Sequence, residues 1–225
     1  KEAPAETEAN IKNSSSIIPA YPTALKWHEN WNVDLVGLAL NQKIPKKDHV
    51  YTSAPQAGKT DVRLTDKTKI DAWFGQYSQT QPPNYGILLE GTRTVVVDID
   101  MHEGKGDGLK SWRHFKDYLH KTPGGLDLWK KLSNAPTIQT ASRPQPGFHM
   151  WLKCSGNWEI PTTSTGNGKH GGVDLKTTNG YLVAEGSVIN GIQYVRVNGV
   201  EGDPLSANDI DEADLVLIES GADWE

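Results

Sequence analysis

A run of β-branched residues that ends in two aspartates constrains this 225-residue chain more than any other stretch. Residues 94–100 read Thr-Val-Val-Val-Asp-Ile-Asp, a composition typical of a buried strand. Side chains alternate between the two faces of a strand, so Asp98 and Asp100 point the same way while Ile99 and two valines point into a core. Two carboxylates on one face favour a bound cation, and Mg²⁺ or Mn²⁺ prefers such oxygen ligands. The alternative is a solvated turn with two ordinary turn aspartates.

The composition predicts a soluble, globular protein with one large domain or two small ones. No apolar run approaches the length of a membrane span, and the first residues do not resemble a signal peptide. The single cysteine, Cys154, excludes an intramolecular disulfide and a cysteine-based zinc site. We therefore expect a cytoplasmic protein in which Cys154 is a packing residue.

The charge of the chain is unevenly distributed. Residues 201–225 carry nine acids and no Lys or Arg, which leaves 19 acids and 23 bases in residues 1–200. A mildly basic body permits phosphate binding without requiring it. Residues 1–16 are polar and without periodicity, and we expect residues 1–18 to form a disordered leader.

The hydrophobic pattern predicts an α+β fold, in which helices flank a mixed or antiparallel sheet. The predicted helices are residues 20–31, 67–77, 109–121, 126–132 and 211–219. The predicted strands are residues 33–40, 85–90, 94–100, 136–142, 148–153, 172–177, 181–184 and 192–197. Turn signals at 91–92, 143–147 and 179–180 predict hairpins between the strands that flank them.

Two further strands carry polar residues in a pattern that matters for function. His149 lies on the strand that follows the turn containing Ser142 and Arg143. Asp174 and Lys176 share one face of the strand at residues 172–177. Residues 41–66 carry several bases that are candidates for nucleotide or DNA phosphates, although a solvated loop is the plainer interpretation; these are Lys43, Lys46, Lys47, Lys59 and Arg63.

In this order, these elements resemble the archaeo-eukaryotic primase superfamily, and above all the bifunctional primase-polymerase (prim-pol) domains of phage and plasmid replication proteins. The family has an apolar strand that ends Asp-x-Asp, a hairpin with a histidine, and an apolar-Asp element followed by a Gly-Tyr segment. Here the last of these is Gly180 to Ser187, and Asn84-Tyr85-Gly86-Ile87 matches an upstream strand. The hairpin lacks the paired glycines of the family, and Glu185 and Gly186 replace its prolines.

The resemblance implies a catalytic domain at residues 19–200, built from an N-terminal α/β part and an RRM-like part that form one unit. The acidic segment 201–225 would link it to a downstream domain, expected to be a helicase in the same full-length chain. The implied activity is template-directed nucleotidyl transfer, as a DNA primase and DNA polymerase. Its partners would be single-stranded DNA template, primer, and NTP or dNTP, in the host cytoplasm if the protein is phage-encoded.

The resemblance also assigns roles to individual residues. Asp98, Asp100 and Asp174 would hold two Mg²⁺ or Mn²⁺ ions, with no zinc, and His149 would complete the catalytic set. The nucleotide triphosphate would be bound by His149, Arg143, Ser142, Lys176 and Ser187. The weakly expected DNA contacts are the bases of residues 41–66.

Two other functions remain compatible with the sequence. A metal-dependent glycosyltransferase also ends an apolar strand in Asp-x-Asp, but it would need a nucleotide-binding βαβ unit that residues 20–66 do not supply. A non-catalytic module that binds single-stranded DNA would use the basic face and some of the eight tryptophans for stacking.

Overall fold

The structure is a computed structural model that describes residues 19–51, 56–77, 83–101, 107–161, 171–178, 180–198 and 209–220. The expected leader, residues 1–18, lies outside them. The described chain combines helices with sheets that are mainly antiparallel, and the predicted α+β class is confirmed. Among the described residues, no helix is both long and apolar enough to cross a membrane.

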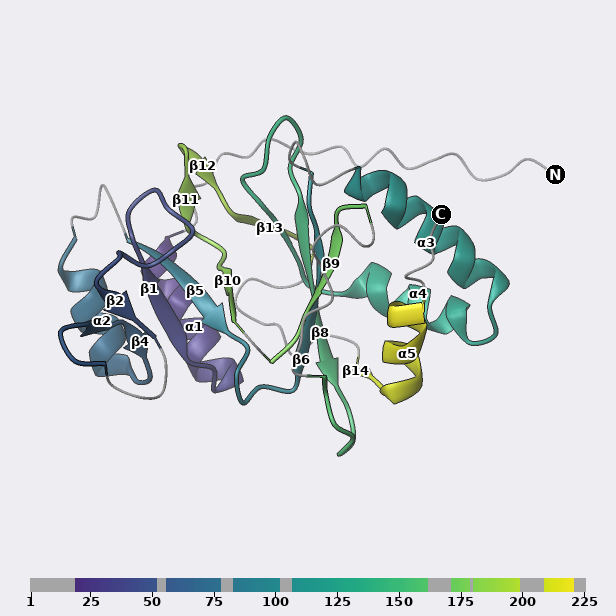
Figure 1. The fold of residues 1–225 in the computed structure, drawn as a ribbon, viewed down its shortest axis with the longest axis horizontal. Coiled ribbons are helices and arrows are strands. Elements are labelled where there is room, and N and C mark those ends of the chain that lie inside the picture. Colours follow the sequence, from purple (N-terminus) through teal and green to yellow (C-terminus); the bar gives the residue numbers. More distant parts are fainter. Residues whose placement is uncertain are drawn as a thin grey trace.

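A four-stranded antiparallel sheet and two helices form one side of the molecule (Figure 1). The strand order is β10 (Tyr181–Val183), β5 (Asn84–Leu88), β1 (Leu35–Leu38) and β4 (Arg63–Leu64). Helices α1 (Ala20–Trp31) and α2 (Lys67–Gly75) pack against it through buried aromatic and aliphatic side chains. Asp66 caps α2 by accepting a hydrogen bond from the Lys69 N–H, which explains where this helix begins.

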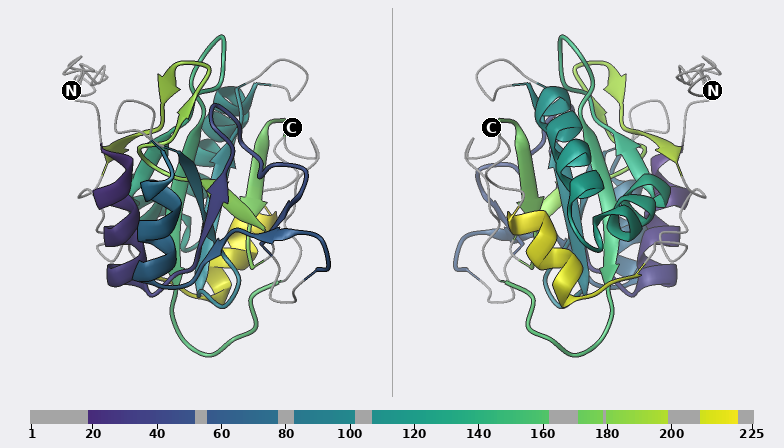
Figure 2. Two further views of the ribbon diagram at one scale, coloured as in Figure 1. Left: turned by 90° about the vertical axis from the view of Figure 1, so that its left-hand side faces the viewer. Right: turned by 90° about the vertical axis from the view of Figure 1, so that its right-hand side faces the viewer.

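A second, larger sheet occupies the middle of the molecule. Its strand order is β13 (Val195–Asn198), β7 (Thr137–Gln139), β8 (Phe148–Cys154), β6 (Thr94–Ile99) and β9 (Val173–Lys176), and β14 (Asp209–Ile210) pairs with the end of β8. One face of this sheet, here called the rear face, is covered by three helices (Figure 2, right). They are α3 (Gly108–Lys121), α4 (Gly125–Asn134) and α5 (Glu212–Ser220). Two small ribbons complete the fold, one of β2 (His49–Val50) with β3 (Thr60–Asp61) and one of β11 (Val188–Ile189) with β12 (Ile192–Gln193).

Strand β6 lies between two hydrophobic cores. Val95, Val97 and Ile99 pack with the three rear helices, as their spacing predicted. Val96 points the other way and joins Trp151 and the residues of the four-stranded sheet in a second core. Both faces of β6 are therefore buried by packing, which specifies its register and orientation strongly.

The turn signals predicted two hairpins that the structure does not contain. The turn at residues 91–92 joins β5 to β6, but β5 pairs with β1 and β10, and β6 pairs with β8 and β9. Both edges of each strand are already occupied, so the two strands cannot pair with each other. Likewise β10 does not pair with β9, which precedes it in the chain. It pairs with the edge of β5 that β1 leaves open. Each turn is thus a crossover between the sheets, whereas the hairpin of β7 and β8 is confirmed.

The end of the described chain packs onto the larger sheet. Residues 209–220 fall in the stretch expected to be an acidic linker, and they form β14 and α5. Ile210, Leu215 and Ile218 are buried in the rear core, and Asp214 forms an ion pair with Lys131 of α4. Buried apolar side chains rather than charge hold this segment to the body.

A buried ion pair connects the two sheets. Glu185 follows β10 and is fully buried, and it accepts hydrogen bonds from Nε and Nη2 of Arg196 on β13 at 3.0 and 2.8 Å. The Arg196 side chain is 5 % exposed, and its guanidinium lies 5.5 Å from the centre of the Trp27 ring. The pair therefore joins β13 to the segment after β10 and to α1.

We predict that Arg196→Met lowers the free energy of unfolding by about 3–5 kcal/mol, because it leaves the Glu185 carboxylate buried without its main partner. Chemical denaturation measures the change. The double variant Glu185→Leu/Arg196→Met, which removes both charges, should recover a large part of the loss. A single variant within about 1 kcal/mol of the wild type, as for an exposed pair, would contradict this account.

Candidate active site

The register of β6 places three polar side chains in one row across the larger sheet. Asp98 is directly opposite His149 on β8 and directly opposite Asp174 on β9. Residues that are opposite each other in an antiparallel pair project from the same face. The row Asp174–Asp98–His149 thus lies on the face of the sheet that is turned away from α3, α4 and α5.

Asp100 completes a cluster of three carboxylates. It follows the last residue of β6, and its N–H donates a hydrogen bond of 2.6 Å to the Gly172 carbonyl before β9. Asp98, Asp100 and Asp174 each offer a carboxylate oxygen within 4.8 Å of the others. Asp98 and Asp174 are buried and Asp100 is half-buried. The sequence predicted that the first two share a face, and the sheet brings the third beside them.

The turn before β8 lies so close to the end of β6 that only glycine fits at position 147. A Cβ on Gly147 would overlap the Ile99 carbonyl. The turn is closed by Thr140, whose hydroxyl accepts a hydrogen bond from the Gly147 N–H and lies 3.0 Å from the Ser142 hydroxyl. One glycine at the close approach is therefore retained although the paired glycines of the family are not.

Burial and like charges make the Asp98 carboxylate unfavourable. Burial is the largest effect that raises the pKa of Asp98 to about 7, and repulsion by Asp100 and Asp174 acts in the same direction. Lys176 and Lys43 partly oppose this shift. A group of carboxylates that repel one another on a buried surface is stabilised by a cation.

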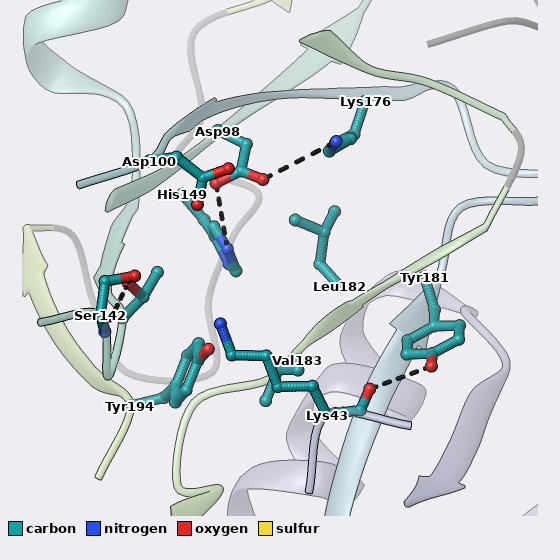
Figure 3. A pocket seen from close by; sticks show the side chains of 11 residues that line it. Lys43, Asp98, Asp100, Ser142, His149, Lys176, Tyr181, Leu182, Val183 and Tyr194 are labelled. Carbon is teal, nitrogen blue, oxygen red and sulfur yellow. Dashed lines mark hydrogen bonds and ion pairs between the residues drawn. The ribbon is translucent and has the colours of Figure 1, made fainter. Parts of the chain in front are cut away.

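Lys176, the last residue of β9, brings a positive charge next to two of the carboxylates. Its Nζ lies 2.8 Å from Asp174 Oδ2 and 3.9 Å from Asp98 Oδ2. Lys43 approaches from the opposite side, on the loop after β1, where its carbonyl accepts a hydrogen bond from the Tyr181 hydroxyl. The two lysines thus flank the carboxylates from different sheets (Figure 3).

His149 is a neutral imidazole in this environment. Burial above all, together with the positive charges of Lys43 and Lys176, lowers its pKa to about 3. Nε2 lies 3.5 Å from Asp98 Oδ1, and Nδ1 has no hydrogen-bond partner among the described residues. The buried Tyr194 ring lies beside it, with 5.9 Å between ring centres.

These groups line a pocket of about 230 Å³ between the two sheets (Figure 3). Asp98, Asp100 and His149 form one wall, and β10 of the smaller sheet forms the opposite wall. Asp174 is buried and does not itself line the pocket. The lining residues are Lys43, Asp98, Asp100, Thr140, Ser142, His149, Lys176, Tyr181, Leu182, Val183 and Tyr194. One wall is therefore polar and charged, and the other is mainly aromatic and aliphatic.

Six of the thirteen candidate residues from the sequence line this pocket, and they are Lys43, Asp98, Asp100, Ser142, His149 and Lys176. Arg143 is exposed, and its guanidinium donates a hydrogen bond to the Ser142 carbonyl. The Ser187 hydroxyl is buried and bonded to the backbone N–H and carbonyl of Tyr85. Of the basic residues at 41–66, Lys43 alone among those described lines the pocket.

The other bases of that stretch have different surroundings. Arg63 forms ion pairs with Asp34 and Glu90, at 2.7 and 2.6 Å. Lys59 donates a hydrogen bond to the Lys47 carbonyl, and the Lys46 side chain is exposed. Their density in the sequence thus reflects a charged loop surface with one member at the pocket.

Sequence reasoning assigned no role to Tyr194, Thr140 or the side chains of β10. Tyr194 lies between β12 and β13, where an unbroken strand was expected, and its ring packs beside His149. Tyr181, Leu182 and Val183 reach the pocket because β10 crosses to the smaller sheet. No local sequence signal marks such a crossover, so this wall becomes visible only in the fold.

Residues 24–213 match the protein family described as "Bifunctional DNA primase/polymerase, N-terminal". The chain belongs to this family. Among curated proteins, none matches the chain. Membership supports a DNA primase/polymerase function and nucleotidyltransferase chemistry, with DNA and nucleotides as the implied substrates.

The residues at the pocket fit a divalent cation of the kind that this family implies. The three aspartates supply hard oxygen donors within 4.8 Å of one another. Burial above all, and repulsion by Asp100 and Asp174, raise the pKa of Asp98, and a bound cation would favour its ionised form. The donor set contains no sulfur and so favours Mg²⁺ or Mn²⁺ over softer metals.

We predict that Asp98→Asn stabilises the metal-free protein. In EDTA at about pH 8 the free energy of unfolding should rise by on the order of 2 kcal/mol, because the buried Asp98 is ionised there at a cost. The Asp98 pKa is higher in the folded than in the unfolded chain, so the wild type gains stability as the pH falls below about 7. The advantage of the variant should therefore shrink at about pH 5.5.

Thermal or chemical denaturation at the two pH values, in EDTA, measures this difference. Asp127→Asn, at an exposed site on α4, is the matched control and should change little. An Asp98→Asn protein that is less stable than the wild type at the higher pH would contradict the electrostatic account of the cluster.

Proposed function

We propose that this chain carries out template-directed nucleotidyl transfer, as the DNA primase and polymerase core of a phage- or plasmid-type replication protein. The observation that carries the proposal is the aspartate cluster beside His149, at a pocket flanked by two lysines, in a chain of the prim-pol family. A polyanionic substrate whose charge grows during reaction needs this combination of metal ligands and cations.

Asp98, Asp100 and Asp174 would hold two divalent ions in the proposed mechanism. When bound, Mg²⁺ or Mn²⁺ would favour deprotonation of the attacking 3′-hydroxyl and neutralise charge on the triphosphate and the leaving pyrophosphate. The antiparallel register fixes Asp98 and Asp174 in adjacent strands, so the ligands are positioned before substrate arrives.

The remaining polar groups would bind the triphosphate. Neutral His149 can donate one hydrogen bond to a phosphate oxygen, and because it carries no charge it does not repel a metal ion at the aspartates. Lys176 would move from Asp174 toward phosphate once metal neutralises the carboxylates, and Lys43 would supply positive charge from the other sheet. Ser142, at the edge of the pocket, offers a hydroxyl.

Two of the residues assigned by resemblance have weaker support. Arg143 is exposed in the turn beside Ser142, and we retain it as a phosphate contact from the rim. For Ser187 we propose a positioning role, because both hydrogen bonds of its hydroxyl go to the backbone of Tyr85. It would hold the segment after β10 against β5.

The aliphatic wall formed by Leu182 and Val183, together with Tyr194, would pack against the sugar or base and exclude water from the reacting atoms. The single-stranded template and the primer would reach the pocket past the exposed loop at residues 41–47. We further propose that a helicase domain follows in the full-length protein.

Primer extension on a single-stranded template, with NTP or dNTP and Mg²⁺ or Mn²⁺, tests the proposal. Asp98→Asn/Asp100→Asn should lower the rate by at least about 10²–10³-fold, because it removes two groups of the charge-stabilising centre. Asp117→Asn/Asp127→Asn, on the rear helices, is the matched control and should retain activity. Equal product from wild type and the Asp98/Asp100 variant would rule out this centre. If the wild type and both variants bind DNA but none of them makes product, a non-catalytic DNA-binding module would be favoured.

A second prediction separates two lysines of the same loop. Lys43→Ala should raise the nucleotide KM about tenfold or more, since it removes a charged contact to the triphosphate. Lys46→Ala should leave KM nearly unchanged, because the exposed Lys46 does not line the pocket. Steady-state kinetics with varied nucleotide measures both. Equal effects of the two substitutions would refute a specific role for Lys43.

A further inference from the structure

Helices α3 and α4 concentrate positive charge on a chain that is acidic elsewhere. Residues 108–134 contain six Lys and Arg and only two Asp, whereas the rest of the chain has 17 bases against 26 acids. The six are Lys110, Arg113, Lys116, Lys121, Lys130 and Lys131. Such a segregation of charge marks a surface that attracts a polyanion.

This positive surface lies on the opposite side of the larger sheet from the pocket. Phe115 and Leu119 of α3 and Leu128 and Leu132 of α4 pack against the rear face of the sheet, together with Val97 and its neighbours. The polar faces of α3 and α4 therefore point to solvent, on the side of the sheet opposite the aspartate cluster (Figure 1 and Figure 2, right). The pocket and its lysines do not account for these charges.

Two tryptophans lie between the two helices among these cations. The rings of Trp112 on α3 and Trp129 on α4 are 5.5 Å apart between centres and inclined by 41°. Lys116 Nζ lies 5.6 Å from the centre of the Trp129 ring. The centres of the His120 and Trp129 rings are 6.2 Å apart, and the two rings are inclined by 82°. Both indoles are half-buried, so part of each aromatic surface remains open to solvent.

Among the described residues, two of the six cations form ion pairs. Lys131 pairs with Asp214 of α5, and Lys130 pairs with the exposed Asp127 at 2.9 Å. Within the described part of the chain, no carboxylate forms an ion pair with Arg113 or Lys116, and both side chains are exposed. Arg113 and Lys116, which form no ion pair with a described carboxylate, are therefore available to a partner.

We propose that this rear surface binds single-stranded nucleic acid. We define the rear surface by residues on the solvent side of α3 and α4: Trp112, Arg113, Lys116, His120, Trp129 and Lys130. Exposed cations bind the phosphates of a single strand, and aromatic rings among them stack with its bases. An acidic protein would pair with the charges but would not require partly exposed aromatic rings among them.

The position of α3 gives the strand a route between the pocket and the rear surface. The helix begins beside the metal-ligand cluster, where a Cβ on Gly108 would overlap the Asp100 carbonyl. Ser111 donates a hydrogen bond to the Gly171 carbonyl, which holds this first turn against the segment before β9. Lys110 and Arg113 lie within the first two turns of α3, where they would contact a strand that continues from the pocket along this helix.

Fluorescence anisotropy with a labelled oligothymidylate of about 30 nucleotides, longer than the usual site for one binding module, tests the proposal without metal or nucleotide. Arg113→Gln/Lys116→Gln should weaken binding about tenfold, and should reduce the slope of log K against log salt by about 1.4, or ~0.7 for each phosphate that the protein no longer neutralises. The matched control is Lys67→Gln/Lys69→Gln, two exposed lysines on α2 at the far side of the molecule. It should change neither value.

A third variant examines stacking. Trp129→Leu retains an apolar side chain between the helices and should weaken binding about fivefold or more, with an unchanged salt slope, because it removes a base-stacking ring but no charge. Circular dichroism melting of each variant checks that the fold is retained. A loss of affinity with a reduced salt slope would mean that the substitution also disturbs the cations, and would count against stacking.

Three outcomes would overturn the proposal: no change in affinity or slope for Arg113→Gln/Lys116→Gln, an equal loss in the α2 control, or displacement of the oligonucleotide by polyglutamate at equal charge concentration. The proposal does not depend on catalysis. Asp98→Asn/Asp100→Asn should bind the oligonucleotide with the same sensitivity to the rear-surface substitutions, so failure of the polymerase assay and failure of the rear surface remain distinguishable.

Discussion

The geometry of the candidate site depends on the antiparallel register of β6 with both of its neighbours. A slip of one residue in either pair would turn Asp174 or His149 to the opposite face and separate it from Asp98. The register is specified by packing, because Val95, Val97 and Ile99 enter the rear core while Val96 enters the core between the sheets. Apolar side chains that never contact substrate thus align the groups that are proposed to do so.

The same arrangement carries an electrostatic cost that the protein tolerates. Burial raises the pKa of Asp98, repulsion by the other two carboxylates within 4.8 Å acts in the same direction, and Lys176 offsets only part of the shift. The buried Glu185–Arg196 pair fixes the spacing between β13 and the segment after β10, close to the pocket wall. Stability at this site is therefore lower without a cation than the packing alone would give.

Local patterns predicted the helices, the longer strands and the faces of this fold well, but not such short strands as β2, β3, β4 and β11. Alternation along residues 94–100 assigned Asp98 and Asp100 to one face and the apolar residues to the other, and the same rule joined Asp174 to Lys176. The turn signals at 91–92 and 179–180 were misleading, because a turn sequence specifies a change of direction and not the partner of the strand that follows. The wall formed by β10, the packing of Tyr194 beside His149 and the hydrogen bonds of Ser187 all follow from that long-range pairing.

Diffraction from crystals grown with Mn²⁺ and a non-hydrolysable nucleotide triphosphate tests the central claim most directly, because the anomalous signal locates the metal independently of the protein. The account predicts Mn²⁺ bound by carboxylate oxygens of Asp98, Asp100 and Asp174, with the triphosphate between His149 and Lys43. Strong Mn²⁺ sites elsewhere with none at these three carboxylates, or a nucleotide bound outside the pocket between the sheets, would contradict it.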